Sequence, residues 1–167
     1  MKIYLIGYMY SGKTTVGHAL ARSMGYRFYD LDQAFEAKYH TSIPLFFQRY
    51  GEEAFRRLEQ QMLHTTADLD NVVISTGGGT PCFFDNIQWI NSHGVSVYLD
   101  VTLETILCRA AKSRKTRPIL ADKNPEEREA YVRQQLQQRL PYYQQAQINF
   151  PADTTDIDML KNLLNEK

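Results

Sequence analysis

The chain contains little cysteine, no excess of charge of either sign and no apolar run long enough to cross a membrane. Cys82 and Cys108 are its two cysteines, and they match neither the spacing of a zinc site nor that of a redox pair. Lys plus Arg and Asp plus Glu are 19 each, so the basic excess that marks most nucleic-acid-binding proteins is missing. The first apolar run already ends at Gly7, which is too early for a signal peptide. We therefore expect a reduced cytoplasmic protein that has neither nucleic acid nor a membrane as its partner.

The length of 167 residues suits one domain, 1–167, with a full-sized core. Short apolar runs typical of strands alternate with helix-like segments, and this alternation predicts an α/β fold built on a parallel sheet. The predicted strands are 2–6, 27–30, 72–75, 95–99 and a weaker one at 147–150. The predicted helices are 13–24, 33–39, a turn that Pro44 opens and Gly51 interrupts, then 52–69, 85–92, 103–111, 125–138 and 157–164.

The segment from Gly7 to Thr14 matches the pattern G-x-x-x-x-G-K-[ST], in which a loop between a strand and a helix cradles phosphate groups. Gly7 and Gly12 permit the backbone angles that such a loop needs. Lys13 can reach the β- and γ-phosphates, and the Thr14 hydroxyl can coordinate Mg²⁺. The alternative, a glycine-rich turn that binds nothing, leaves a cation unexplained at a helix start, where the dipole disfavours it. The motif therefore predicts binding of a nucleoside triphosphate, without saying where the phosphate goes.

Two carboxylates, Asp30 and Asp32, come at the end of the second predicted strand. Ligands of an open parallel sheet bind at the carboxyl ends of its strands, and residues i and i+2 of an extended chain point to the same side. One carboxylate could hold a Mg²⁺-bound water while the other faces an acceptor hydroxyl. The equally weighted alternative is a solvated turn in which Asp32 caps the next helix.

Arg56 and Glu59 lie three residues apart on the longest predicted helix and so share a face. They could form a surface ion pair of little energetic consequence. Alternatively, Glu59 orients Arg56, whose planar guanidinium then binds a substrate carboxylate through two hydrogen bonds. The sequence leaves both possibilities open.

Three consecutive glycines, Gly77, Gly78 and Gly79, follow the third predicted strand. Such a run costs chain entropy and adds no packing, so it indicates a place where a ligand touches the backbone rather than a merely flexible turn.

Residues 110–123 hold five cations against one anion. Beside a P-loop, this segment is interpreted as a mobile basic loop over an anionic ligand, and a solvated charged loop is the alternative. Pro118 favours an extended Arg117, which would direct that side chain at the phosphates. Arg139 is ambiguous by itself, because a cation near a helix C-terminus is favourable in its own right.

Taken in order, these segments resemble the shikimate kinase family over positions 7–139. Many NTPases share the P-loop, but its combination with the other motifs is much more specific: Asp30-Leu31-Asp32, Phe55-Arg56-Arg57-Leu58-Glu59, the three glycines and Arg117-Pro118-Ile119-Leu120. The resemblance implies a three-layer P-loop kinase fold, in which helices flank a five-stranded parallel sheet. It also implies a substrate-binding segment at about 31–62 and a lid at about 110–124.

The activity that the resemblance implies is transfer of the ATP γ-phosphoryl group to the 3-hydroxyl of shikimate, with Mg²⁺ as cofactor, in a protein that we expect to be monomeric. Asp32, Lys13 and Arg117 would be catalytic. The shikimate ligands would be Asp32, Arg56, Gly77, Gly78, Gly79 and Arg139, with both arginines on the carboxylate and Glu59 orienting Arg56. The ATP ligands would be Tyr10, Ser11, Gly12, Lys13, Thr14, Thr15, Arg109 and Arg117, and the metal would be held by Thr14 and, through water, Asp30.

The chain departs from the family pattern inside its P-loop. Tyr10 stands where the family has a small residue, which could change the fit around the phosphates, whereas Thr14 in place of Ser keeps the hydroxyl. The family's late adenine-contacting segment would fall around 152–156. The rival functions are another small P-loop kinase, acting on gluconate or a nucleotide, and a nucleotide-gated binding module that has lost catalysis. The intact Lys13, Thr14, Asp32 and Arg117 argue against the second rival.

Overall fold

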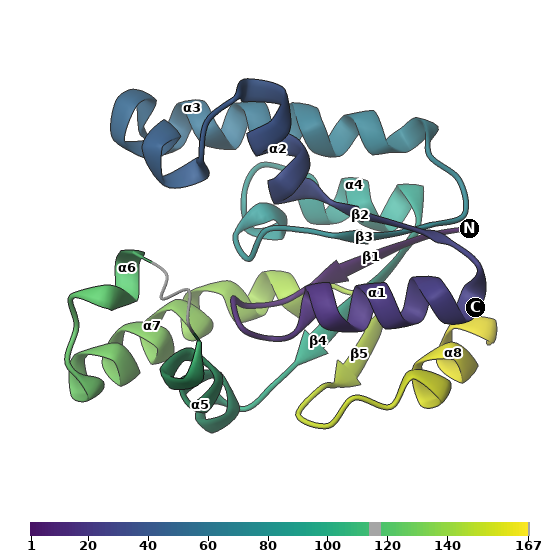
Figure 1. Ribbon diagram of the computed structural model, residues 1–167. Helices are drawn as coiled ribbons and strands as arrows, with labels where there is room; N and C mark the ends of the chain where they lie inside the picture. Colours follow the sequence, from purple (N-terminus) through teal and green to yellow (C-terminus); the bar gives the residue numbers. More distant parts are fainter. Residues whose placement is uncertain (114–117, 167) are drawn as a thin grey trace.

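Five parallel strands form a single sheet at the centre of the molecule (Figure 1). In this computed structural model, which describes residues 1–113 and 118–166, the strands are β1 (Lys2–Ile6), β2 (Arg27–Asp30), β3 (Val72–Ser75), β4 (Val95–Asp100) and β5 (Ile148–Pro151). The order across the sheet is β2–β3–β1–β4–β5, and every neighbouring pair is parallel. The predicted α/β fold with a five-stranded parallel sheet is therefore confirmed.

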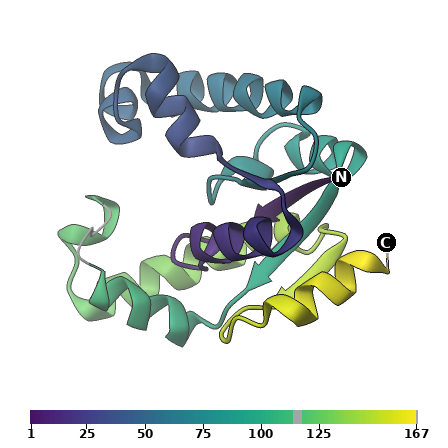
Figure 2. The same cartoon turned by 45° about the vertical axis from the view of Figure 1, so that its right-hand side comes forward.

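Helices cover both faces of the sheet (Figures 1 and 2). Helices α1 (Lys13–Met24) and α8 (Ile157–Asn165) lie in front of it in Figure 1, whereas α4 (Asn86–His93) and the C-terminal part of α7 (Pro125–Tyr143) lie behind. This coverage explains why the central strands are short and apolar: Ile3, Ile74 and Leu99 are all 0% exposed. Within residues 1–113 and 118–166, every helix is too short or too polar to span a lipid bilayer.

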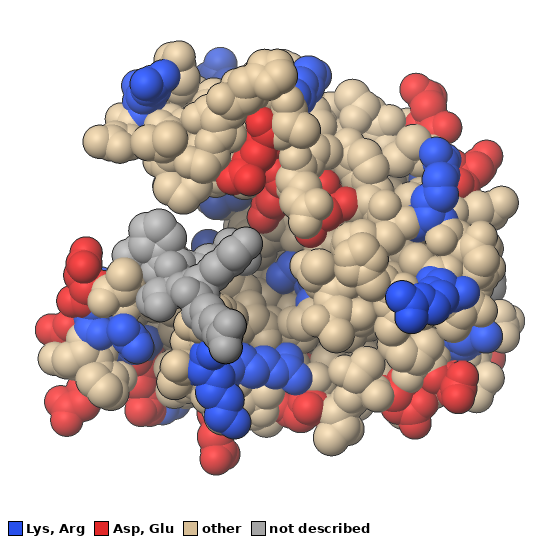
Figure 3. Space-filling view, in the orientation of Figure 1, with Lys and Arg blue, Asp and Glu red and all other residues tan. Residues whose placement is uncertain are grey.

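The strand order creates a crevice at the carboxyl ends of β1 and β3. From β1 the chain crosses through α1 to β2 on one side, whereas from β3 it crosses to β4 on the other side of β1. Ligands of open α/β sheets bind at such a switch point. Two groups of helices extend beyond this edge: α2 (Leu31–Tyr39) with α3 (Ile43–Thr65), and α5 (Leu103–Lys112) with α6 (Pro118–Ala121) and the start of α7. The space-filling view shows the molecule hollowed between them, with acidic and basic side chains on the walls (Figure 3).

The strand predictions agree with the structure to within one residue, and the predicted interruption at Gly51 is confirmed. Gly51 has φ 82° and ψ 171°, which breaks α3 into two helical pieces. Helix α3 ends at Thr65, earlier than predicted, because the chain tightens there into a 3₁₀ turn, Thr66–Asp68.

The prediction that the late helix ends at Gln138 is wrong, because α7 continues to Tyr143 with Pro141 inside it. A proline in a helix interior costs about 3 kcal/mol because it lacks an N–H and its ring clashes with the preceding turn. Burial of the final residue opposes this cost: Tyr143 is 0% exposed, and its ring stacks on that of Tyr98 with centroids 5.1 Å apart.

The predicted basic loop is also not entirely a loop. Residues 118–121 form the short helix α6, in which Leu120 is buried and its carbonyl oxygen accepts a hydrogen bond from Arg128 Nε at 2.9 Å. Arg117 lies outside the described residues.

Candidate active site

The phosphate loop between β1 and α1 depends on glycine at two positions. Gly7 has φ 146° and Gly12 has φ 94°, both in the range that favours glycine. A Cβ at Gly7 would lie 3.0 Å from both the Leu99 carbonyl oxygen and Ser11 Oγ. A side chain at this position would therefore clash as well as strain the backbone, which gives a physical reason for the glycine in the motif.

Lys13 folds its side chain back over this loop. Its Nζ donates hydrogen bonds to the carbonyl oxygens of Gly7 and Tyr8, each at 2.8 Å. Thr14 and Thr15 are exposed in the first turn of α1, and residues 13–16 include no acidic side chain to neutralise the positive end of the helix dipole. The loop thus brings together an ammonium group, hydroxyls and a helix N-terminus, which is the chemistry of an anion site.

Tyr10 adopts a left-handed conformation, with φ 62°, at the position where it departs from the family pattern. This conformation costs a non-glycine residue about 1 kcal/mol or more. Arg109 on α5 donates from Nη1 to the Tyr10 carbonyl oxygen at 3.0 Å, and from Nη2 to the Ala152 carbonyl oxygen at 3.2 Å. Arg109 therefore ties the phosphate loop to the segment that follows β5, the segment in which adenine contacts were expected.

The three glycines after β3 lie directly beside the phosphate loop. The Thr76 backbone N–H donates to the Leu5 carbonyl oxygen at 3.2 Å, which joins the ends of β3 and β1. A Cβ at Gly78 would lie 3.3 Å from the Met9 backbone nitrogen and 3.3 Å from Arg139 Nη1. The middle glycine thus separates the phosphate loop from an arginine on α7.

The other two glycines face the remaining predicted acceptor residues. A Cβ at Gly77 would lie 2.9 Å from Asp32 Oδ1, and one at Gly79 would lie 2.6 Å from Arg56 Nη2. Asp32, Arg56 and Arg139 come from three separate helices, yet they converge on one turn of glycine backbone. The structure therefore brings together the sequence-predicted acceptor residues in the described ranges; whether they bind shikimate stays a prediction.

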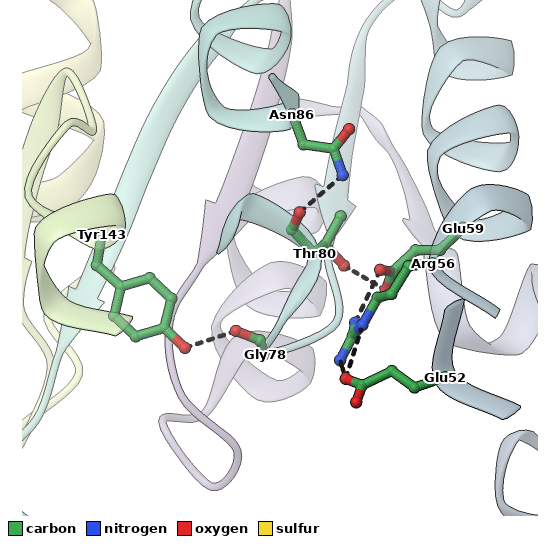
Figure 4. Close-up of polar contacts among 7 residues, drawn as sticks. All are labelled: Glu52, Arg56, Glu59, Gly78, Thr80, Asn86 and Tyr143. Atoms are coloured by element: carbon green, nitrogen blue, oxygen red, sulfur yellow. Dashed lines mark hydrogen bonds and ion pairs between the residues drawn. The ribbon is translucent and has the colours of Figure 1, made fainter. Parts of the chain in front are cut away.

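Arg56 and Glu59 are buried, so the surface ion pair that the sequence left open is not what the structure contains. Arg56 is 8% exposed and Glu59 is 3% exposed, and Arg56 Nη1 donates to Glu59 Oε1 at 2.8 Å (Figure 4). The guanidinium lies 4.1 Å from the centroid of the Phe83 ring, and its Nε and Nη2 lie 3.4 Å from Glu52 Oε1. These contacts hold the guanidinium in one orientation.

The two aspartates differ from the arrangement that their spacing predicted. Helix α2 begins at Leu31 rather than at Gln33, because Asp30, and not Asp32, is its N-cap: Asp30 Oδ1 accepts from the Gln33 N–H at 3.1 Å. Asp32 lies in the first helical turn. The prediction that Asp30 and Asp32 lie in an extended chain and point to the same side is therefore wrong, although the Asp32 carboxylate still lies beside Gly77.

The residues predicted to hold Mg²⁺ are one hydroxyl and one carboxylate, Thr14 and Asp30. Within residues 1–113 and 118–166, no three His, Cys, Asp or Glu side chains group in a way that could hold a metal. This sparse set of oxygen ligands fits Mg²⁺, which keeps several waters and is commonly held by substrate phosphates together with one or two protein ligands.

The alternative explanation for Arg139, a cation at a helix C-terminus, is not what the structure contains. Helix α7 continues for four residues past Arg139, and its last turn, 140–143, holds no basic side chain. Arg139 instead interacts electrostatically with the Tyr143 side chain and lies over the Tyr8 ring, 5.5 Å from its centroid.

The sequence interpretation missed several residues that surround these side chains. Thr80, Phe83, Tyr143, Glu52 and Cys82 carry no motif, and a hydroxyl, ring or thiol in isolation gives no signal of a site. Burial raises the pKa of the Cys82 thiol to about 11, even though Arg139 and Arg56 lower it. Cys82 is therefore an unreactive neighbour of the two arginines at neutral pH.

Comparison with known proteins matches this chain to one family. The family model for shikimate kinase covers residues 9–165. A shikimate kinase of Parabacteroides distasonis is 42% identical over 167 residues, which are 98% of this chain and 96% of that protein. The crystal structure of a shikimate kinase from Bacteroides thetaiotaomicron superposes with a TM-score of 0.96 at 41% identity, over 99% of this chain and 98% of that one. A shikimate kinase of Acinetobacter baumannii, solved in complex with shikimate, gives a TM-score of 0.88 at 33% identity, over 99% and 94% of the two chains. The glycine-bridged site and these full-length similarities agree: the chain belongs to the shikimate kinase family.

Proposed function

We propose that this chain transfers the γ-phosphoryl group of ATP to the 3-hydroxyl of shikimate, giving shikimate 3-phosphate and ADP for the biosynthesis of aromatic amino acids. The observation that carries the proposal is the position of the three glycines. They lie against the phosphate loop at Met9 and against Asp32, Arg56 and Arg139. A phosphate donor and a carboxylate-bearing acceptor held on the two sides of this turn would meet at it.

The donor side is built to neutralise phosphate charge. Lys13 would exchange its hydrogen bonds to the loop carbonyl oxygens for the β- and γ-phosphates, and the loop N–H groups and the start of α1 would hold the rest. Thr14 and, through water, Asp30 would hold Mg²⁺, which supplies positive charge to the phosphate oxygens. Arg109 and the segment after β5 would line the binding site for the adenine ring.

The acceptor side is built to orient a small acid. Arg56 and Arg139 would bind the shikimate carboxylate, because planar guanidinium groups pair well with carboxylates. Asp32 would align the 3-hydroxyl and accept its proton late, since an alcohol is far less acidic than a carboxylic acid. Positioning and charge neutralisation account for most of the catalysis when the transition state is loose.

Closure over the two substrates would complete the site. Arg117, in the predicted lid, would reach the phosphates and help to exclude water, which suppresses hydrolysis of ATP. The Acinetobacter baumannii relative was solved with shikimate, which supports the choice of acceptor. We expect the enzyme to act as a cytoplasmic monomer.

The direct test is one incubation of the protein with ATP, Mg²⁺ and shikimate, read by mass spectrometry. We expect a product heavier than shikimate by one phosphoryl group, formed in step with ADP. Gluconate and nucleoside monophosphates serve as control acceptors and should give no product. Phosphorylation of either control in preference to shikimate would replace the proposed acceptor, and ATP binding without any product would favour a binding module.

A further inference from the structure

One buried hydroxyl links the glycine turn to Glu59, the carboxylate that holds Arg56. Thr80, directly after the three glycines, is 0% exposed, and its Oγ1 donates to Glu59 Oε2 at 2.7 Å. The other oxygen of the same carboxylate accepts from Arg56 at 2.8 Å. Thr80 therefore satisfies the half of the Glu59 carboxylate that the arginine does not use, and it orients that carboxylate (Figure 4).

A second buried hydroxyl holds the same turn beside Arg139. Tyr143 is 0% exposed, and its Oη donates to the Gly78 carbonyl oxygen at 2.5 Å. Arg139 interacts electrostatically with the Tyr143 side chain, and its Nη1 would lie 3.3 Å from a Cβ at Gly78. Burial raises the pKa of Tyr143, so the hydroxyl keeps the proton that it donates to Gly78. Residues 78–80 thus have the Tyr143 hydroxyl on one side and the Glu59–Arg56 pair on the other (Figure 4).

The turn itself is held from behind. Asn86 is 0% exposed and donates from Nδ2 to the Thr80 carbonyl oxygen at 2.8 Å. Its Oδ1 has no hydrogen-bond partner in the described part of the chain. A buried oxygen without a hydrogen bond destabilises the fold by about 1–3 kcal/mol. The amide nitrogen of the same side chain, however, holds the Thr80 backbone in place. The Thr80 backbone therefore has little freedom to move, which fixes the position from which its hydroxyl reaches Glu59.

We propose that Thr80 and Tyr143 are positioning residues that set the spacing of Arg56 and Arg139 for a substrate carboxylate, an inference that rests on the proposed function. Neither side chain needs to touch the substrate. A bidentate clamp made by two arginines on different helices works only at one separation, and the shared glycine turn is the element that connects the two helices.

The test compares variants that remove one hydroxyl each. Thr80→Val and Tyr143→Phe keep the shape of the side chain, and Thr80→Ser keeps the hydroxyl. The matched controls are Thr66→Val and Tyr98→Phe. Thr66→Val removes an equally buried hydroxyl that donates to the Leu63 carbonyl oxygen and also hydrogen-bonds to the Tyr4 hydroxyl. Tyr98→Phe removes a hydroxyl that donates to Asp100 and keeps the ring that stacks on Tyr143. Thermal unfolding, followed through Trp89, the chain's single tryptophan, reports whether each variant is folded.

We expect Thr80→Val and Tyr143→Phe each to raise the KM for shikimate about tenfold while the KM for ATP stays within about twofold. Thr80→Ser should restore most of the affinity, and the two controls should keep the parent KM for shikimate. If Thr80→Val is too unstable to assay, Tyr143→Phe carries the test, since it removes a single oxygen atom.

Parent-like shikimate KM values in the folded variants would overturn the inference, and so would an equal rise in the controls or a rise in the KM for ATP. These outcomes differ from failure of the proposed function, in which the parent protein itself would not phosphorylate shikimate.

Discussion

The two sides of the glycine turn are built in opposite ways. The donor side is mostly backbone: eight consecutive residues, Gly7–Thr14, provide the loop, and its shape depends on positive φ angles at Gly7, Tyr10 and Gly12. The acceptor side is mostly side chains, drawn from α2, α3, α7 and the turn after β3. Its central pair, Arg56 and Glu59, is buried, whereas Thr14 and Thr15 on the donor side are exposed.

Because of this difference, we expect the two sides to respond differently to amino-acid substitution. A backbone loop tolerates many side chains but fails when a glycine is replaced, because the strain lies in the main chain. A cluster of buried charges and hydrogen bonds fails when one member is removed, because the others lose their partners.

Asp32→Asn should separate chemistry from donor binding most strongly. We expect kcat to fall by about 10²–10⁴-fold, because the amide cannot accept the proton, while the affinity for ATP stays near that of the parent. Steady-state kinetics and nucleotide titration measure the two quantities. Near-normal turnover would remove Asp32 from its proposed role.

Arg56→Ala should break the acceptor side alone. We expect the KM for shikimate to rise about a hundredfold, and the free energy of unfolding to fall by about 3 kcal/mol, because Glu59 is left as a buried charge without its partner. Its neighbour Arg57 offers a matched control: Arg57 and Glu53 form an ion pair at 2.6 Å with side chains 68% and 80% exposed.

Arg57→Ala should cost less than about 1 kcal/mol and leave both KM values unchanged, because exposed ion pairs contribute little. A rise in the KM for ATP rather than for shikimate in Arg56→Ala would show that the carboxylate assignment is wrong.

Gly7→Ala should break the donor side alone. The new Cβ would lie 3.0 Å from the Leu99 carbonyl oxygen and from Ser11 Oγ, at a φ that strains an alanine. We expect the KM for ATP to rise about tenfold, since backbone strain of this kind costs of order 1–3 kcal/mol, with little change in the KM for shikimate. Equal loss of affinity for both substrates would mean that the two sides are not separable.

The two cysteines should differ in reactivity without any effect on activity. Cys82 has a thiol pKa of about 11 and Cys108 is exposed, so iodoacetamide at pH 7 should label Cys108 first. The thiolate is the nucleophile, so labelling of Cys82 should speed up about tenfold per pH unit between pH 7 and 10. Peptide mass spectrometry measures both rates, and fast labelling of Cys82 at pH 7 would show that the thiol is not buried against the acceptor side.

The donor side could be predicted almost completely from the sequence, because its parts are adjacent in the chain and its motif specifies both the loop and the helix that follows. The acceptor residues could be named through family resemblance, but their arrangement could not. Whether Arg56 and Glu59 form a surface pair depends on burial, and burial depends on Thr80 and Phe83, which lie more than 20 positions along the chain from the pair. The sequence did not identify Asp30 as the helix cap, because either Asp30 or Asp32 could accept a hydrogen bond from the first turn of the helix.

The sequence by itself determined the parallel α/β sheet, the phosphate loop and the glycine turn, because alternating short apolar runs, glycine spacing and strand ends are local properties of the chain. Only the tertiary structure decided that Arg139 lies inside a longer helix, since burial of Tyr143 outweighs the local cost of Pro141. It also decided that both arginines lie beside one turn, which the Thr80 and Tyr143 hydroxyls join to two helices. Those contacts join residues 21 and 65 positions apart, and such distant pairing arises from packing of whole helices against the sheet rather than from any local pattern.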